Sequence, residues 1–567
     1  MALRFGFILG LVALYIAGWQ MNAHQAPTWL LASLMGVVFI ALVAAMYLRV
    51  LPALLALPIL ALALASIAGM KWDAILTTVV GEGSTRLSTA ILAAIFGSIL
   101  AQVVEKTGIA QTAIKKTAEL GGDKPIFLAV LLTIVIALLF TTLGGLGAVI
   151  MVATIVIPIL LSLGLRPLYV GCLFLMAMSL GGAFNLQNWA LYKDALGLDN
   201  AQIGAFAWPF AGLMLVVTFA FLAIEGKRMG KARFKAELTE TEPTHQFVPW
   251  YALLTPIVPL IPVLVFTLLP KVYQKQPLVG ITYMNEKPAN VYVNAVGVDS
   301  FGDGNFEGHD PSVTIQAGEM GTVRPGKYSI EVYSLESNNT LAKVQDMSLD
   351  PWTKTDVQVS FSEDGKATIT PVATPTTFDF PIVAALLLGI IYGALTTWRR
   401  GQSTVQLLTK SSFDGVGAVG PALVLMIGIG MVLKATMAPE VSNIISPVIA
   451  LIVPKGDTFG SIVHYVLLFG IFAPLALYRG PFNMWGMGAG LLAVLAAKMP
   501  GGALMGAFMS TGMIQGVSDP TNTHNVWIAN YTNTDVQDIM KRTLPYMWVL
   551  AFIGLILSAV LYYGVMK

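Results

Sequence analysis

Two short polar stretches interrupt apolar sequence and hold residue types that bind ions or carboxylates. The first, here called the first amide break, contains Asn185, Gln187 and Asn188. Carboxylate, hydroxyl, amide and imidazole groups fill the second amide break, which contains Ser518, Asp519, Thr521, Asn522, Thr523, His524 and Asn525. Oxygen-rich tips of this kind suit Na⁺, a hydrated solute, or both. We expect both breaks to line a binding site; the alternative is a polar loop outside the membrane.

Asp519 is the only acid within the second amide break. An ionisable group at membrane depth is costly and is therefore a functional candidate by default. Asp519 could bind Na⁺ as a carboxylate, or carry a proton if burial favours its neutral form. The alternative is a helix cap, because Asp-Pro often precedes a helix. His524 could titrate or donate to an anion, or serve as a hydrogen-bonded structural group.

A glycine-containing break precedes each amide break at a matching distance: Gly144 lies 44 residues before Asn188, and Gly480 lies 45 before Asn525. The first glycine break contains Thr141, Thr142, Gly144 and Gly145, and the second contains Arg479, Gly480, Pro481 and Asn483. Arg479 could bind a carboxylate through two parallel hydrogen bonds, or act as a cytoplasmic anchor. The glycines could equally reflect close helix packing. The matched spacing predicts an internal repeat.

The rest of the composition excludes several classes of protein. Hydrophobic residues make up 56% of the 567 residues and charged residues only 11%, whereas a soluble domain carries about 25% charged residues. The net charge of +2 gives no case for nucleic-acid binding, and a single cysteine, Cys172, excludes an internal disulfide. We see no HExxH or G-x-S-x-G motif, so we expect no enzyme and no cofactor. The sequence predicts a polytopic membrane protein that contacts lipid.

A membrane span needs about 20 mostly apolar residues. Fifteen candidate segments lie near 5–19, 28–47, 50–69, 86–105, 125–140, 146–163, 168–183, 203–224, 248–269, 379–397, 415–434, 460–477, 482–498, 502–516 and 543–565. We read the first as a retained helix rather than a signal peptide. Basic clusters after the eighth and tenth segments place the N-terminus in the cytoplasm. The predicted fold class is an all-α polytopic protein of two inverted-topology repeats with broken helices and an inserted extracytoplasmic β-sandwich-like domain.

The predicted domains are an extra N-terminal helix (1–27), a first repeat (28–247), a second repeat (248–270 and 377–567) and the insert (271–376). The insert contains 21 charged residues, of which 13 are acidic. Alternation in 327–333 and 356–361 is typical of half-buried strands, and 363–366 has the sequence of a hairpin turn. We expect the insert to be an accessory structure.

The stretch from Phe96 to Ala110 resembles the glycine-punctuated early segment of the gluconate:proton symporter family, and the stretch from Asn522 to Thr543 is similar to that family's last hairpin. Citrate and lactate permeases and NhaC-type Na⁺/H⁺ antiporters of the ion transporter superfamily share this plan. The resemblance implies a homodimer and cation-coupled uptake of an organic anion.

We therefore expect a secondary active transporter of the bacterial inner membrane. It would move a small carboxylate in symport with H⁺ or Na⁺. A Na⁺/H⁺ antiporter is the alternative, because Asp519 and its hydroxyl neighbours could serve cations alone. A membrane sensor that reads a ligand through the insert is a third reading, and it would need no internal repeat.

Overall fold

The computed structural model of the protein describes residues 20, 26–47, 50–121, 125–229, 248–268, 380–398, 403–454, 459–485, 488–496 and 499–562, together with eight strands of the insert. Contacts divide the chain into two compact units, one of Met1–Val263 with Pro381–Lys567 and one of Leu264–Phe380. The predicted N-terminal helix at 5–19 and the basic positions 231–235, 399 and 400 lie outside the described residues.

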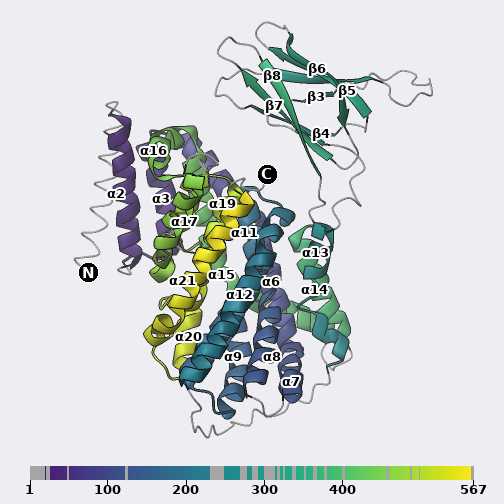
Figure 1. The fold of residues 1–567 in the computed structure, drawn as a ribbon, viewed down its shortest axis with the longest axis vertical. Coiled ribbons are helices and arrows are strands. Elements are labelled where there is room, and N and C mark those ends of the chain that lie inside the picture. The colour runs from purple at the N-terminus through teal and green to yellow at the C-terminus, as the bar shows by residue number, and fades with distance from the viewer. Residues whose placement is uncertain are drawn as a thin grey trace, which may run out of the picture. The chain divides into compact units, whose positions relative to one another are not determined.

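Helices before the insert are α2 (Thr28–Tyr47), α3 (Ala53–Ile67), α4 (Trp72–Ala74), η1 (Ile75–Glu82), α5 (Gly83–Thr85), α6 (Ser88–Lys106), α7 (Ile109–Gly121), α8 (Pro125–Phe140), α9 (Gly145–Ser162), α10 (Pro167–Gly182), α11 (Leu186–Leu196), α12 (Asn200–Met229), η2 (Trp250–Leu254) and α13 (Leu260–Leu268). After it come α14 (Ile382–Thr396), α15 (Thr404–Met437), α16 (Pro439–Ile452), α17 (Phe459–Ile471), η3 (Ala473–Arg479), α18 (Gly488–Ala496), α19 (Gly501–Ser518), α20 (Thr523–Tyr531) and α21 (Val536–Tyr562). Figure 1 shows these elements in chain order by colour.

Six helical stretches of the described chain are long and apolar enough to cross a membrane, which is the character of an integral membrane protein. They are Trp72–Lys106, Gly145–Ser162, Asn200–Lys227, Thr404–Met437, Phe459–Arg479 and Val536–Tyr562. A seventh is reached if α10 and α11, bent by 50° at their break, count as one span.

The predicted fold class of about fifteen spans in two inverted repeats is therefore wrong. Apolar windows in a sequence do not report where a helix ends. The segment at 125–140, for example, forms a helix of 16 residues. At about 1.5 Å per residue such a helix is shorter than the ~30 Å hydrocarbon layer. The segment predicted at 482–498 contains a turn followed by α18, which has only nine residues.

The insert contains eight strands, drawn as arrows in Figure 1. They are β1 (Leu278–Tyr283), β2 (Val291–Val298), β3 (Val313–Ile315), β4 (Met320–Thr322), β5 (Gly326–Ser334), β6 (Thr340–Leu349), β7 (Thr353–Phe361) and β8 (Ala367–Pro375). Two four-stranded sheets result, with the orders β4-β1-β7-β8 and β3-β2-β5-β6. β7 and β8 pair antiparallel on either side of the predicted turn at 363–366, which lies outside the described residues.

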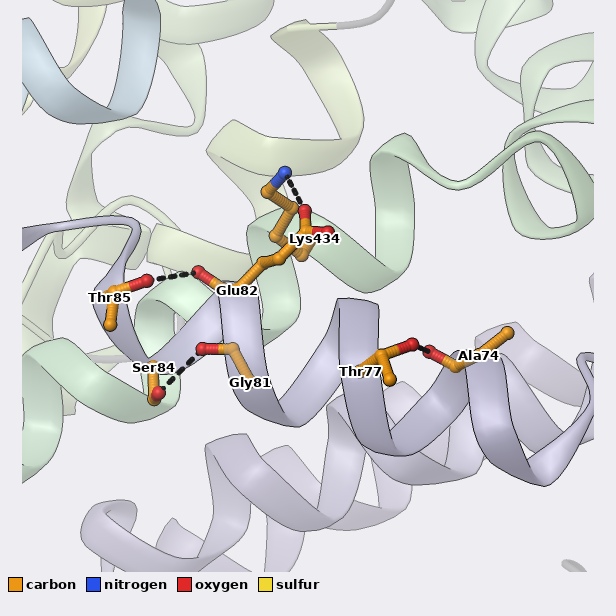
Figure 2. A network of polar contacts seen from close by, with 7 residues as sticks. All are labelled: Ala74, Thr77, Gly81, Glu82, Ser84, Thr85 and Lys434. Atoms are coloured by element: carbon orange, nitrogen blue, oxygen red, sulfur yellow. Dashed lines mark hydrogen bonds and ion pairs between the residues drawn. The ribbon is translucent and has the colours of Figure 1, made fainter.

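A π-helical stretch, η1, precedes α6, and an ion pair ties its end to α15. The Lys434 ammonium lies 2.6 Å from the Glu82 carboxylate. Hydroxyls of Thr77, Ser84 and Thr85 donate to carbonyls of their own helical stretch, as Figure 2 shows. A π-helix forms i→i+5 hydrogen bonds and is rare, so side chains and neighbouring helices must stabilise it.

α12 and α21 pack side by side in opposite directions (Figure 1). Near the end of α12, Glu225 contacts Arg542 near the start of α21. At the other end of the pair, the Tyr562 hydroxyl donates to the Gln202 carbonyl at 2.7 Å. α21 also packs closely on α19, which in turn contacts α10. These helices carry or cover both amide breaks.

Candidate functional site

Both amide breaks end one helix and cap the next with an asparagine. The Asn185 side chain accepts hydrogen bonds from the backbone N–H groups of Gln187 (3.0 Å) and Asn188 (3.4 Å) at the start of α11. The Asn522 side chain accepts from the N–H of His524 (3.1 Å) at the start of α20. Asparagine is a preferred N-cap because its carbonyl satisfies N–H groups that have no partner within the helix.

A second asparagine in each break reaches back to the preceding helix. Asn188 Nδ2 donates to the Gly182 carbonyl at 3.1 Å, and Asn525 Nδ2 donates to the Asp519 carbonyl at 3.0 Å. In each case the acceptor lies six residues earlier in the chain. The two sequence breaks thus form the same local structure.

The first amide break holds the first glycine break in place. Asn185 Nδ2 donates to the carbonyls of Phe140 (3.0 Å) and Leu143 (3.1 Å), and the N–H of Leu186 donates to the Thr141 carbonyl (3.3 Å). The Phe140 carbonyl lies at the end of α8 and the Leu143 carbonyl lies in the turn after it, where no further helical turn supplies N–H partners, so this buried amide satisfies both.

Gln187 lies in a slot between two glycines. A Cβ atom added to Gly97 would lie 2.5 Å from Gln187 Nε2, and one added to Gly144 would lie 3.0 Å from Gln187 Oε1. Any larger residue at Gly97 would therefore displace the Gln187 side chain or α6. The two glycines therefore leave room for the Gln187 side chain as well as allowing close helix packing.

Asp519 holds the second glycine break by accepting hydrogen bonds. Its carboxylate accepts from the backbone N–H groups of Tyr478 (3.0 Å) and Arg479 (3.3 Å), and from the N–H (2.8 Å) and hydroxyl (2.7 Å) of Thr521. Asp519 is completely buried. Tyr478 and Arg479 both have left-handed backbone conformations, with φ of 56° and 58°. Successive N–H groups in such a turn form a concavity that binds an anion, and the Asp519 carboxylate fills it.

The other predicted site residues lie around these two clusters. Thr141 Oγ1 donates to the Leu138 carbonyl, whereas Thr142 Oγ1 is buried and makes no hydrogen bond within the described part of the chain. The Ser518 hydroxyl contacts Thr543 of α21 at 2.8 Å. Asn483 is buried, and its side chain accepts from the N–H of Trp485 at 2.9 Å. The Arg479 side chain and Thr523 are exposed, His524 is half-buried, and Gly145 has a φ of +82° that suits glycine.

A cavity of about 110 Å³ lies between the first amide break and α19. Its lining comes from α10, α11, the turn before α18, and α19. The polar lining residues are Ser179, Asn188, Tyr192, Trp485 and Gln515, and the apolar ones include Phe508, Met509 and Met513. None of the described lining residues is charged. The cavity can therefore offer amide and hydroxyl groups to a solute within a largely apolar wall.

Of the predicted site residues, only Asn188 lines this cavity; Asn522 reaches it indirectly, because its Nδ2 donates to the Gln515 carbonyl at 3.3 Å. Ser179, Trp485 and Gln515 were missed because they lie inside predicted apolar segments, and Tyr192 was missed because it lies between the segments 168–183 and 203–224 and belongs to no motif. The matching spacing of the two amide breaks could have pointed to two residues beside the cavity. Ser179 precedes Asn188 by the same interval as Gly516 precedes Asn525, and these two residues meet: a Cβ on Gly516 would lie 2.7 Å from Ser179 Oγ.

No family model and no curated protein matches this sequence. Among solved structures, the chain is similar to the YdaH transporter of Alcanivorax borkumensis, whose crystal structure is described as revealing an unusual topology. The two are 14% identical, the match covers 86% of this chain and 89% of that one, and the TM-score is 0.47. At this identity and TM-score the likeness does not bear on substrate, coupling ion or site residues.

Proposed function

We propose that this protein is a membrane transporter that moves a small solute through the cavity beside the two amide breaks. The observation that supports this most is the pair of matching helix breaks, one of which lines the cavity directly. Broken helices within a membrane expose backbone polar groups, which are tolerated where they are buried in protein or line a cavity. Transporters use such breaks as binding sites.

The proposed solute is a small carboxylate, and the proposed class is a secondary transporter of the ion transporter superfamily. Gln515 and Asn188 supply amide N–H groups, and Ser179 and Tyr192 supply hydroxyls, that could donate to a carboxylate. The coupling ion is H⁺ or Na⁺, and the membrane is the bacterial inner membrane. A carboxylate needs no cationic partner when several neutral donors converge on it.

A Na⁺/H⁺ antiporter is the second candidate, and one observation favours it: among the residues that the structure describes, no basic side chain lines the cavity. The Arg479 guanidinium, which could pair with an anion, is exposed instead. Amide and hydroxyl oxygens of the same lining could serve a cation.

Reconstituted vesicles distinguish the two candidates. Purified protein in proteoliposomes is given labelled lactate, gluconate or citrate under an imposed Na⁺ or H⁺ gradient, with counterflow exchange as a parallel assay. Gradient-driven uptake of one carboxylate supports the proposal. Exchange of ²²Na⁺ for H⁺ with no carboxylate movement supports the antiporter. Movement of neither in well-inserted protein contradicts both.

A further inference from the structure

One end of the cavity lies beside the helix breaks and carries hydroxyl and amide groups. Ser179 of α10 faces Gly516 of α19 there, since a Cβ atom added to Gly516 would lie 2.7 Å from Ser179 Oγ. Gln515, next to Gly516 in the chain, lines the cavity as well. Asn188, a third lining residue, donates to the carbonyl of Gly182, which follows Ser179 by one helical turn. Ser179, Asn188 and Gln515 are called the polar end of the cavity.

The polar end has hydrogen-bond donors to spare. The Ser179 hydroxyl and the Gln515 side-chain amide make no hydrogen bond within the described part of the chain. Ser179 is 7% exposed, so a group inside the cavity is the partner within reach of its hydroxyl. The carbonyls of Gly182 and Gln515, by contrast, already accept from the side-chain amides of Asn188 and Asn522. The polar end therefore offers free O–H and N–H groups to the oxygens of a solute.

Farther along α19 the lining becomes apolar. Met509 and Phe508 line the cavity six and seven residues before Gln515, and both are buried. At about 1.5 Å per residue, this places them roughly 10 Å from Gln515 along the helix. Phe508 meets the buried Phe482 edge-on, so packed side chains lie behind it. A thioether and an aromatic ring offer contact area to a solute but no strong hydrogen bond. Phe508 and Met509 are called the apolar end.

We propose that the solute of this cavity is a short-chain aliphatic monocarboxylate of the size of butyrate, bound with its carboxylate at the polar end and its hydrocarbon chain at the apolar end. This inference rests on the proposed function and deepens it. The two oxygens of one carboxylate accept from the Ser179 hydroxyl and the Gln515 amide. The hydrocarbon chain leaves water for Phe508 and Met509, and burial of each CH₂ group tightens binding about fourfold.

The same lining disfavours the other classes of small carboxylate. A second or third carboxylate, as in citrate, would lie where no described lining residue is charged, and an unpaired buried charge is strongly unfavourable. The hydroxyls of a sugar acid such as gluconate would exchange water for the ring of Phe508 and the thioether of Met509, and would be left without partners. Lactate, a monocarboxylate with one hydroxyl, should bind with intermediate affinity.

Equilibrium binding to the purified full chain tests the inference. Binding is measured rather than uptake because the neutral acid form of butyrate crosses a bilayer without a carrier. We expect labelled butyrate to bind about tenfold more tightly than acetate, which is two CH₂ groups shorter, and at least about tenfold more tightly than gluconate or citrate, with lactate between them. Binding of gluconate or citrate as tight as that of butyrate, or no gain from acetate to butyrate, would overturn the inference and leave the transporter proposal standing. Failure of lactate, gluconate and citrate to move in proteoliposomes would count against the proposed function instead.

Two variants test the two ends separately. Ser179→Ala should weaken binding of acetate and butyrate alike, by about tenfold, because both lose a hydrogen bond to their carboxylate. Ser510→Ala is the matched control: Ser510 lies on α19, does not line the cavity, and donates to the Gly506 carbonyl at 2.7 Å. Unchanged affinity in Ser179→Ala would overturn the placement of the carboxylate.

Met509→Gln keeps the length of the side chain and adds an amide at the apolar end. Butyrate should then bind more weakly and gluconate more tightly, whereas Met509→Leu should keep the parent's preference. Thermal unfolding of each variant checks that it is folded. Ser179→Ala removes one oxygen and introduces no clash, so it decides the question even if Met509→Gln does not fold. An unchanged ratio of butyrate to gluconate affinity in folded Met509→Gln would overturn the placement of the hydrocarbon chain.

Discussion

Asp519, which the sequence suggested for ion coupling, stabilises a turn of the backbone. The left-handed conformation costs a non-glycine residue roughly 1–2 kcal/mol, and Tyr478 and Arg479 adopt it in succession. The carboxylate of Asp519 offsets this cost by binding both of their N–H groups. The sequence suggested Na⁺, a proton or a cap for this residue, and could not show that Tyr478 and Arg479, two of its three partner residues, lie about 40 residues earlier in the chain.

Asp519→Asn should destabilise the protein by about 3 kcal/mol, because the amide nitrogen cannot accept from a backbone N–H and leaves a buried donor unsatisfied. Thermal unfolding of the purified protein, followed by tryptophan fluorescence, measures this. Thr521→Ser is the control, since it keeps the hydroxyl that donates to Asp519. Equal stability of Asp519→Asn and the parent would show that the turn does not depend on the charge.

Arg479→Gly should stabilise the protein by about 1 kcal/mol, because glycine adopts the left-handed conformation without a Cβ clash. Gly197→Ala is the reciprocal control: Gly197 has a φ of +68° and an added Cβ meets no atom within 4 Å, so only backbone strain is introduced. It should destabilise by a similar amount. If Arg479→Gly is neutral in unfolding assays but abolishes carboxylate uptake, the guanidinium binds solute as the sequence pattern first suggested.

At the scale of elements, the sequence predicted the breaks better than the spans. Helices do end at both amide breaks, because Asn185 and Asn522 are strong N-caps and their signal is local. The number of spans depends on where each apolar helix bends or stops, as in the 50° bend between α10 and α11. Tertiary contacts and a π-helix such as η1 cannot be recognised from the hydropathy of the sequence.

Gly97→Ala should weaken the contact between α6 and α11 by about 1–3 kcal/mol, because the new methyl group overlaps the Gln187 amide. Gly212→Ala on exposed α12 surface is the matched control, since its Cβ meets nothing within 4 Å. The midpoint of thermal unfolding should fall for the first variant and stay level or rise slightly for the second. Identical midpoints would mean that the slot is looser than these distances indicate.

At the scale of the whole molecule, the insert and the helical unit are separate compact bodies. The predicted insert bounds of 271–376 fall within the second body, because a change from apolar to charged composition is visible without any structure. The cavity was not predictable in this way, since most of its lining comes from residues that read as ordinary apolar helix.

Replacing residues 275–372 with a short flexible linker should leave transport in place, because every described residue that lines the cavity belongs to the helical unit. Uptake in proteoliposomes is compared with that of the full chain at equal amounts of inserted protein. Complete loss of uptake with normal insertion would give the insert an essential part in translocation.

The central claim is that solute occupies the cavity between the first amide break and α19, and blocking that cavity tests it most directly. Gly182 and Gly512 both line it, and a Cβ added to either meets no atom within 4 Å, so two methyl groups can enter without a clash. Counterflow exchange is measured for Gly182→Ala/Gly512→Ala against Gly212→Ala, with insertion and thermal stability checked for each. We predict that exchange falls sharply only in the double variant while its stability is unchanged. Exchange at the parent's rate and half-saturation in the double variant would contradict the claim.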